Sequence, residues 1–372
     1  MRHRCLLSLV GVTTLRRLLS TTPPRSPPPA RVQALYDGLR GGDRGSLARA
    51  ITLVESTRPD HKEDTQQLLA LVLEHSKQPP VFKPSLAGES FPTTFRIGLS
   101  GSPGVGKSSF IETFGMYLIS KGHRVAVLAV DPSSTRTGGS ILGDKTRMPL
   151  LSTHDSAYIR PSPSSCTLGG VARNTNEAIL LCEAGGYDII LVETVGVGQS
   201  ETMVSEMTDM FTLLVAPGGG DELQGLKKGI VELSDLILVN KSDGELEGAA
   251  RVAVMEYVSA LKFVKGGWEP WRAEVLPVSS HRGTHIPEAW EIMKRYYHEI
   301  ESSGYLFQKR GTQRKNWMWR GITDELIWRL KNDVHVRDMI QQLEGDVFEG
   351  HFAPGQAADK VLAEFISRQQ KR

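Results

Sequence analysis

The strongest chemical signal in the sequence is a glycine-rich octapeptide, Gly101-Ser102-Pro103-Gly104-Val105-Gly106-Lys107-Ser108, which matches the pattern G-x-x-x-x-G-K-[ST]. Its glycines let successive backbone N–H groups point at phosphate oxygens, and Lys107 adds a positive charge for the β- and γ-phosphates. Ser108 supplies a hydroxyl for Mg²⁺, and Ser109 follows it. A chance glycine-rich turn is disfavoured, because an apolar run precedes the motif and a helical pattern follows it. Residues 101–109 are therefore predicted to bind a nucleoside triphosphate.

Acidic residues at the ends of apolar runs are the candidates for holding the metal ion. Glu193 ends the run 189–192, and we expect it to hold Mg²⁺ directly or through water. Gly196 follows, and its amide is expected to meet the γ-phosphate and to be released on hydrolysis. Asp131 ends the run 125–130, and Asp144 lies in the loop after it as the weaker candidate metal ligand, since most acids in such loops are simply solvated. Lys107, Glu193 and Asp131 are thus the predicted catalytic residues.

A third motif points to the base of the nucleotide. The tetrapeptide Asn240-Lys241-Ser242-Asp243 directly follows the apolar run 236–239 and matches the N-K-x-D pattern. A carboxylate at Asp243 can accept hydrogen bonds from N1–H and the exocyclic amine of guanine, a donor pair that adenine lacks. The tetrapeptide Val278-Ser279-Ser280-His281 ends a later run and is expected to contact the guanine carbonyl through its amides. Together these motifs predict GTP and GDP, not ATP, as the ligands.

The elements that must position these motifs are read from hydrophobic periodicity. Short apolar runs alternate with longer helical stretches from residue 95 onward, which is typical of a mostly parallel sheet with helices on both faces. We expect an α/β fold of the P-loop NTPase type, with a core at 93–304, an arm and linker at 37–92 containing a helical hairpin over 44–78, and a helical tail at 305–372. The strands are predicted at 95–99, 125–130, 189–192, 211–215, 236–239 and 275–278.

The tail differs in composition from the core. Its three tryptophans, Trp317, Trp319 and Trp328, stand among basic residues. Tryptophan is more often a core residue than an interface residue, so we expect these rings to be buried, although interfaces also favour Trp and Arg. A packed subdomain, a dimerisation arm and a surface for a partner protein remain open for this segment.

The first 36 residues have the composition of a mitochondrial transit peptide. They contain no Asp or Glu, and their positive charges are Arg2, Arg4, Arg16, Arg17, Arg25 and Arg31. A secretory signal would need a longer apolar centre than residues 6–12 and a small-residue cleavage site, and the remaining alternative is a disordered basic tail. We predict import into the mitochondrial matrix, with residues 1–36 outside the fold.

Overall composition excludes several classes of protein. Lys and Arg number 44 and Asp and Glu 42 among 372 residues, and the resulting charge of +2 gives no basis for general binding to nucleic acid. No apolar run approaches the roughly 18 residues of a membrane-spanning helix. The three cysteines, Cys5, Cys166 and Cys182, show no C-x-x-C spacing, which argues against a secreted disulfide scaffold. We expect neither a nucleic-acid partner nor a membrane partner.

Beyond the separate motifs, the stretch 95–262 resembles the MeaB-type P-loop GTPases that chaperone cobalamin-dependent methylmalonyl-CoA mutase, and the mitochondrial members are the nearer match. The resemblance extends to the arm and the tail, and therefore covers nearly all of the chain after residue 36. The segments that carry it are Gly101–Ser109, Asp131–Ser134, Gly143–Met148, Glu193–Glu201 and Pro217–Lys228.

The resemblance implies more than spacing does. Such proteins use GTP hydrolysis, with Mg²⁺, to gate delivery of adenosylcobalamin to methylmalonyl-CoA mutase and to protect or replace a damaged cofactor. They form homodimers, partly through C-terminal segments, and residues 218–224 resemble their additional switch loop. This chain has no D-x-H-x-x-G cobalamin pattern, so we expect adenosylcobalamin to bind the mutase and to meet this protein only indirectly.

Two other functions are less consistent with the sequence. A GTPase that inserts a metal into an apoenzyme would favour a Cys-x-Cys or His-rich tract, whereas the ten histidines here are scattered. A P-loop kinase would prefer ATP and would need a pocket for a phosphoryl acceptor, whereas the Asn240–Asp243 motif predicts guanine. GTP hydrolysis by Mg²⁺-assisted attack of water is therefore the preferred mechanism.

Overall fold

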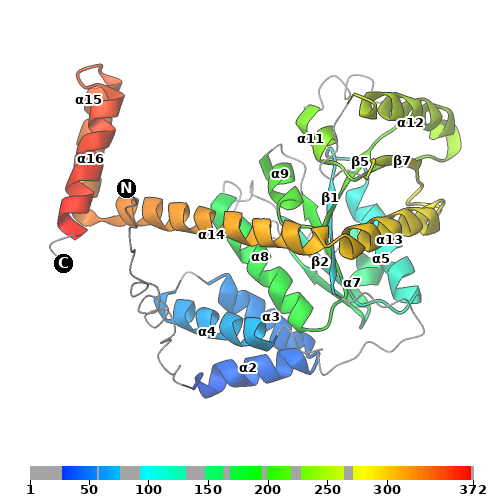
Figure 1. The fold of residues 1–372 in the computed structure, drawn as a ribbon, viewed down its shortest axis with the longest axis horizontal. Coiled ribbons are helices and arrows are strands. Elements are labelled where there is room, and N and C mark those ends of the chain that lie inside the picture. Colours follow the sequence, from blue (N-terminus) through cyan, green and yellow to red (C-terminus); the bar gives the residue numbers. More distant parts are fainter. Residues whose placement is uncertain are drawn as a thin grey trace, which may run out of the picture.

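A single sheet of seven parallel strands forms the centre of the computed structural model, which describes residues 27–56, 58–75, 93–130, 147–161, 168–194, 199–218, 228–263 and 271–369. The strand order is β3-β2-β4-β1-β5-β6-β7, and every neighbouring pair is parallel. Helices cover both faces, so the predicted α/β fold is confirmed (Figure 1). The strands are β1 (Phe95–Ser100), β2 (Val125–Val130), β3 (Ala157–Arg160), β4 (Ile189–Thr194), β5 (Met210–Val215), β6 (Leu236–Val239) and β7 (Glu274–Pro277).

The central strands are apolar along their whole length because both faces of the sheet are covered. Side chains alternate between the faces, so Val125 and Val127 of β2 join one hydrophobic cluster while Ala126 and Leu128 join the other. One cluster also contains side chains of α5 (Lys107–Ser120), α7 (Pro149–Thr153) and α13 (Ile286–Ser302). The other contains α2 (Ala30–Arg40), α3 (Arg44–Val54), α4 (Pro59–His75), α8 (Leu168–Ala184), α9 (Gln199–Ser205), α11 (Lys228–Leu233) and α12 (Glu247–Leu261).

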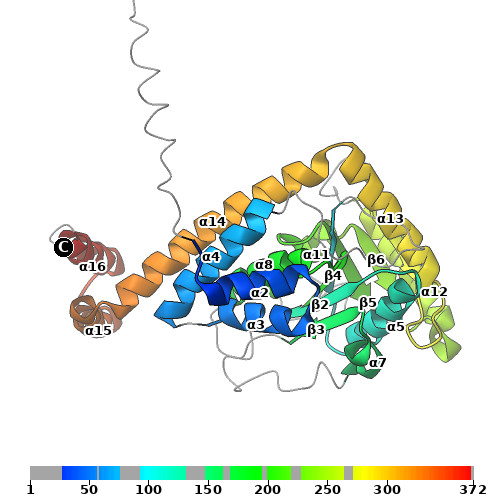
Figure 2. The same cartoon turned by 90° about the horizontal axis from the view of Figure 1, so that it is seen from below.

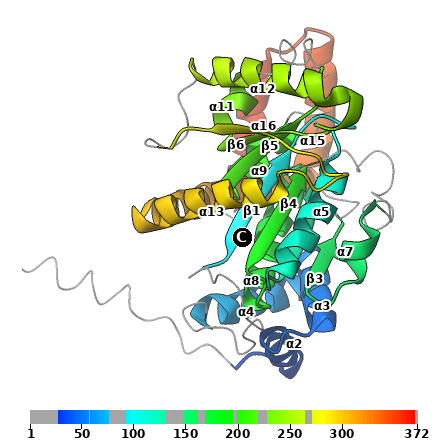
Figure 3. The same cartoon turned by 90° about the vertical axis from the view of Figure 1, so that its right-hand side faces the viewer.

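The N-terminal helices form a separate layer at one edge of the sheet. Helices α2, α3 and α4 pack on one another and on α8, near β3, whereas α12 covers the opposite edge beside β7 (Figure 3). Asp43 caps α3 by accepting hydrogen bonds from two backbone N–H groups, and Pro59 begins α4 at a position where proline leaves no helical hydrogen bond unmade. The expected hairpin over 44–78 is therefore seen as α3 and α4.

The C-terminal helices leave the core. Helix α14 (Tyr305–Asn332) starts after Gly304 and extends about 42 Å. At its far end, α15 (Val334–Phe348) and α16 (Pro354–Gln369) pack together as a hairpin (Figure 1). Part of α14 runs beside α4, where Lys62 Nζ lies 3.2 Å from a Glu325 carboxylate oxygen (Figure 2). Within the described ranges, every helix is either too short or too polar to span a bilayer.

Three sequence expectations need correction. Residues 30–36 belong to α2, with Val32 and Tyr36 buried against the core, so the fold begins before residue 37. Strand β3 was not predicted, because only Ala157, Tyr158 and Ile159 form an apolar run before Arg160. The tryptophans of α14 are not all core residues: Trp317 is partly buried, whereas Trp319 and Trp328 are 57% and 61% exposed.

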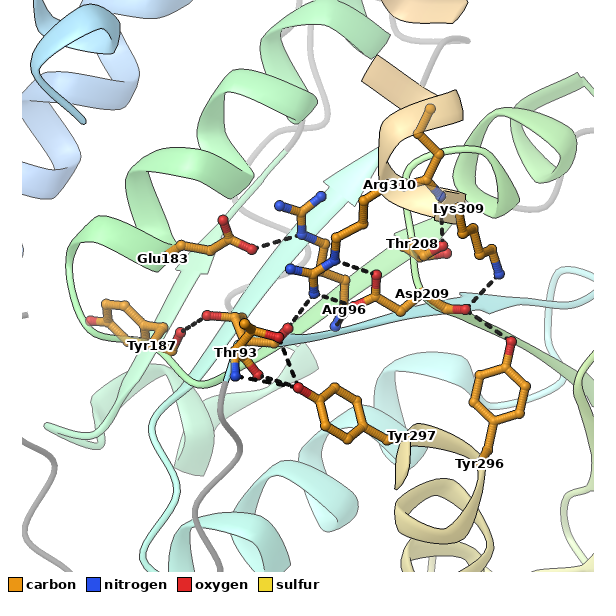
Figure 4. A network of polar contacts seen from close by, with 12 residues as sticks. Thr93, Arg96, Glu183, Tyr187, Thr208, Asp209, Tyr296, Tyr297, Lys309 and Arg310 are labelled. Carbon is orange, nitrogen blue, oxygen red and sulfur yellow. Dashed lines mark hydrogen bonds and ion pairs between the residues drawn. The ribbon is translucent and has the colours of Figure 1, made fainter. Parts of the chain in front are cut away.

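A buried carboxylate joins α14 to the sheet (Figure 4). Asp209, directly before β5, is fully buried and accepts hydrogen bonds from Arg310 Nε at 2.8 Å and from Arg310 Nη2 at 2.6 Å. The backbone N–H of Arg96 donates to the same carboxylate at 2.9 Å. Burial alone would raise the pKa of the Asp209 carboxyl, but the Arg310 guanidinium and these hydrogen bonds outweigh burial and hold that pKa below its ordinary value. Asp209 therefore remains ionised, and Arg310 neutralises it.

Replacing Arg310 with Met should lower the free energy of unfolding at pH 7 by about 3–5 kcal/mol, because the Asp209 carboxylate would stay buried without its guanidinium. In the wild type the Asp209 contribution is complete above about pH 4 and is lost as the pH falls through the lowered pKa, so the two proteins should converge at acid pH. Urea unfolding between pH 3 and 7 measures both effects. Arg314→Met, at an exposed position of the same helix, is the control, and a loss below roughly 1 kcal/mol for Arg310→Met would contradict the assignment.

Candidate functional site

The predicted phosphate loop connects β1 to α5 at the carboxyl edge of the sheet. Gly106 lies in the left-handed region with φ 95°, and α5 begins directly after it with no side chain capping its first amides. A Cβ on Gly106 would lie 2.7 Å from Asn240 Nδ2, so only glycine lets the loop approach that side chain. Uncapped amides at the start of a helix, after a glycine-rich turn, form a site for an anion.

Lys107 lies folded into this loop. Its Nζ donates to the carbonyl oxygen of Gly101 at 2.6 Å and to that of Ser102 at 3.2 Å. Burial lowers the pKa of the Lys107 ammonium, while the negative charges of Glu193 and Glu201 act in the opposite direction. A phosphate group would replace carbonyl partners with full negative charges, which favours binding of a polyanion at this position.

The candidate metal ligands come from two elements. The Ser108 hydroxyl donates to Glu193 Oε1 at 3.4 Å, and the parallel pairing of β1 with β4 brings Glu193 beside Leu99 at the strand ends. Both side chains offer oxygen atoms as metal ligands, which suits Mg²⁺. Within the described ranges no group of three His, Cys, Asp or Glu residues is placed to hold a metal. A hydroxyl and one carboxylate beside a phosphate loop fit an ion that also takes ligands from its substrate.

Asn240 connects the two nucleotide loops. Its side chain is buried and donates from Nδ2 to the Val105 carbonyl oxygen at 2.9 Å. In the other direction, Asn240 Oδ1 accepts from the backbone N–H of Ser280 at 3.2 Å and from its hydroxyl at 2.7 Å. One carboxamide therefore fixes the phosphate loop and the loop after β7 relative to each other.

Lys241 and Asp243 of the same motif also make side-chain contacts at these loops. Lys241 has a left-handed backbone with φ 59°, and its Nζ donates to the Gly104 carbonyl oxygen at 2.7 Å. The Asp243 side chain is 23% exposed, and Arg282 Nε lies 3.7 Å from its Oδ2. The Asp243 carboxylate is therefore partly open to solvent beside the phosphate loop.

The predicted residues after β7 have different surroundings. Ser279 is fully buried, and its hydroxyl accepts from the backbone N–H of Arg282 at 3.0 Å, so its side chain stabilises the turn. Ser280 is also buried, and its carbonyl oxygen accepts from Thr113 Oγ1 of α5 at 2.7 Å. His281 is exposed.

The remaining predicted site residues differ in exposure, and some of them lie outside the described residues. Val105 is buried in the core, whereas Pro103 and Ser109 are exposed and Ser102 is partly buried. The structure brings together Lys107, Ser108, Glu193, Asn240, Lys241, Asp243 and Ser280. Asp131, Asp144 and Gly196 lie outside the described residues.

Three contributors were missed by sequence reasoning. Thr113 supports the loop after β7 from α5, and Arg282 pairs with Asp243. Glu201, a buried residue of α9, is close enough to Lys107 for its charge to act on the ammonium. Glu201 ends the segment 193–201 that resembled the known GTPases, and Arg282 directly follows a predicted motif, so these two carried a signal. Thr113 carried none.

Comparison with known proteins agrees with this geometry. The family model described as methylmalonyl-CoA mutase-associated GTPase MeaB matches residues 47–335. The mitochondrial methylmalonic aciduria type A homolog of Mus musculus is 52% identical over 337 residues, which are 91% of this chain and 80% of the relative. The GTPase ArgK of Escherichia coli is 45% identical over 289 residues, which are 78% of this chain and 83% of the relative.

A solved structure supports the same conclusion. The crystal structure of a LAO/AO transport system kinase superposes with a TM-score of 0.70 at 34% sequence identity, covering 91% of this chain and 98% of its own. The family model and the identities over most of the chain identify the family, and both the family model and the Escherichia coli relative are named GTPases. The chain therefore belongs to the MeaB family of methylmalonyl-CoA mutase-associated GTPases, and it is a GTP hydrolase.

Proposed function

We propose that GTP hydrolysis by this chain gates the delivery of adenosylcobalamin to methylmalonyl-CoA mutase and protects the mutase from a damaged cofactor. The observation that carries the nucleotide part is the Asn240 carboxamide, which holds the phosphate loop and the base loop together. The client protein is inferred from the family description, which names the mutase. Adenosylcobalamin enters the proposal through that mutase and not through a site on this chain.

Residue roles follow from the contacts. We assign Lys107 and the amides of residues 101–108 to the β- and γ-phosphates, where they stabilise the charge that spreads over the transferred group. The Ser108 hydroxyl and the Glu193 carboxylate, which lie within 3.4 Å of each other, would hold Mg²⁺. When bound, Mg²⁺ would neutralise charge on the phosphate oxygens. Asp131 and Asp144 are proposed as further acids for the same ion, and Gly196 as the amide that meets the γ-phosphate.

Recognition of guanine is assigned to Asp243. Its carboxylate would accept hydrogen bonds from N1–H and the exocyclic amine, and Arg282 would keep that carboxylate oriented. The buried side chain of Ser280 holds the neighbouring loop, so the site does not need to reorganise when the base arrives.

The proposal also includes a homodimer and a location in the mitochondrial matrix. Helices α14 and α16 expose large apolar side chains, including Trp319, Trp328 and Ile366, that a second copy of the chain would cover in a homodimer. We also propose import into the mitochondrial matrix. Because α2 begins at Ala30 and its Val32, Tyr36 and Leu39 side chains are buried, we propose that the transit peptide ends before that helix and not at residue 36.

Asp243→Asn should change the base preference of the site from guanine to xanthine. An amide offers one acceptor and one donor, which match N1–H and the C2 carbonyl of xanthine, so affinity for GTP should fall on the order of 10³-fold while affinity for XTP rises. Calorimetric titration with each nucleotide measures the change. Asp333→Asn, which preserves a helix cap far along the chain, is the matched control. Unchanged GTP affinity in Asp243→Asn would remove Asp243 from base recognition.

Glu193→Gln should separate metal binding from nucleotide binding. The amide keeps the size of the side chain but removes its charge, so the Mg²⁺ concentration that gives half-maximal GTP hydrolysis should rise by about 10- to 100-fold. Hydrolysis across a Mg²⁺ titration at saturating GTP measures this concentration. The control is Glu177→Gln, which changes a partly buried carboxylate on α8. Equal Mg²⁺ dependence in the wild type and Glu193→Gln would contradict the role of Glu193.

The gating function itself is tested by adding the client. We expect GTP turnover to be slow for the protein alone and to rise roughly tenfold or more with methylmalonyl-CoA mutase, because a partner that orders the catalytic loops supplies missing transition-state contacts. Phosphate release is measured with and without the mutase, using bovine serum albumin as the inert protein. Equal turnover in both samples would reject partner-gated hydrolysis.

A further inference from the structure

Five side chains of α14 hold residues 206–209, the segment that follows α9. Lys309, Arg310, Gln313, Trp317 and Arg320 fall within an arc of about 100° on the helix, so they share one face over three turns. All of them contact residues 206–209, which connect α9 to β5. Figure 4 shows the first part of this row, where Lys309 and Arg310 reach Asp209.

The side chains further along α14 contact Thr208 and Glu206. Gln313 Nε2 donates to the Thr208 carbonyl oxygen at 2.8 Å, and Trp317 Nε1 donates to the Glu206 carbonyl oxygen at 3.2 Å. Arg320 Nη2 lies 2.5 Å from Glu206 Oε2, and its guanidinium stacks over the Trp317 ring at 4.9 Å from the ring centroid. Along three turns of α14, the contacts thus run from Asp209 through Thr208 to Glu206.

The same segment is continuous with the end of α9. The backbone N–H of Glu206 donates to the Thr202 carbonyl oxygen at 3.1 Å, and Thr208 Oγ1 donates to the Val204 carbonyl oxygen at 2.8 Å. Residues 206–208 therefore close the last turn of α9, and a displacement of α9 would carry them with it.

The other end of α9 lies next to the phosphate site. Helix α9 begins at Gln199, shortly after β4 ends at Thr194, and Glu193 of that strand accepts from the Ser108 hydroxyl of α5 at 3.4 Å. Glu201, in the first turn of α9, is buried, and its negative charge acts on the Lys107 ammonium of the phosphate loop. A γ-phosphate would compete with this carboxylate for the same cation and would repel it. Triphosphate and diphosphate therefore have different interaction energies with α9, which is the requirement for a shift between two positions.

We propose that α14 is the element through which the nucleotide controls the C-terminal arm: α9 moves with the phosphate charge beside Lys107, and the side chains that hold residues 206–209 transmit this movement to α14. The apolar face of α14 opposite this row, with Met318, Trp319, Ile322 and Leu326, would then be presented differently in the GTP and GDP states. The inference rests on the proposed function and specifies its regulation. By reciprocity, a protein bound to the arm must change nucleotide affinity by the same factor.

The test removes the two contacts that α14 makes with Glu206, the indole N–H of Trp317 and the guanidinium of Arg320, while leaving the Arg310–Asp209 ion pair in place. Full-length wild type and the double variant Trp317→Phe/Arg320→Ala are compared by hydrogen–deuterium exchange over residues 305–369, with GDP and with a non-hydrolysable GTP analogue. We expect exchange in the wild type to differ between the two nucleotides by about fivefold or more, and we expect this difference to be lost in the variant. Arg314→Ala, an exposed arginine of the same helix, should behave as wild type.

The outcomes separate the two levels of the proposal. If the wild type binds both nucleotides but exchange in the arm is equal, or if the double variant keeps the wild-type difference, the coupling is wrong and the GTPase function stands. If the wild type binds no guanine nucleotide, both are wrong. Should the double variant fail to fold, Glu206→Gln removes the Arg320 ion pair from the other side, and it must reduce the difference for the coupling to hold.

Discussion

One buried carboxamide holds the nucleotide site together. Asn240 donates to the phosphate loop at Val105 and accepts from the loop after β7 at Ser280, so a single side chain with 1% exposure carries hydrogen bonds in both directions. A buried amide can be retained at low cost only when its donors and acceptors are satisfied, and these contacts provide both. The separation between the phosphate loop and the loop after β7 is therefore set by the fold itself, through this asparagine and through the parallel order of β1 and β6 on either side of β5.

A second constraint is electrostatic. Lys107 is largely buried, and burial of an ammonium is unfavourable unless negative charge lies nearby. Glu193 and Glu201 supply that charge from two different elements, one at the end of a strand and one on a short helix. The strand residue is fixed by backbone pairing on both sides, whereas α9 is held by packing of its side chains, including Met203 and Val204. The same ammonium is thus balanced by acids from two differently anchored elements.

The sequence predicted the central strands and the phosphate loop better than the elements that pack around them. Apolar runs located the central strands, and glycine spacing located the phosphate loop, because both signals are local. Strand β3 was missed because its apolar run stops at Arg160, and α2 was missed because its buried Val32 lies in an arginine-rich segment that suggested a leader. The roles of Thr113 and Trp317 depend on how α5 and α14 pack against distant loops. Such contacts have no local pattern, so only the folded chain reveals them.

The close approach at Gly106 has a consequence for natural variation in this protein. Any side chain there would meet Asn240 Nδ2 at 2.7 Å and push apart the two loops that this asparagine joins, so one missense change would displace the phosphate loop and the loop after β7 together. At Gly104, which also has a left-handed backbone (φ 83°), a Cβ would meet nothing within 4 Å, and an alanine there would add only about 1–2 kcal/mol of backbone strain. Two glycines of one motif, two positions apart, therefore differ sharply in how well the protein would tolerate their inherited replacement.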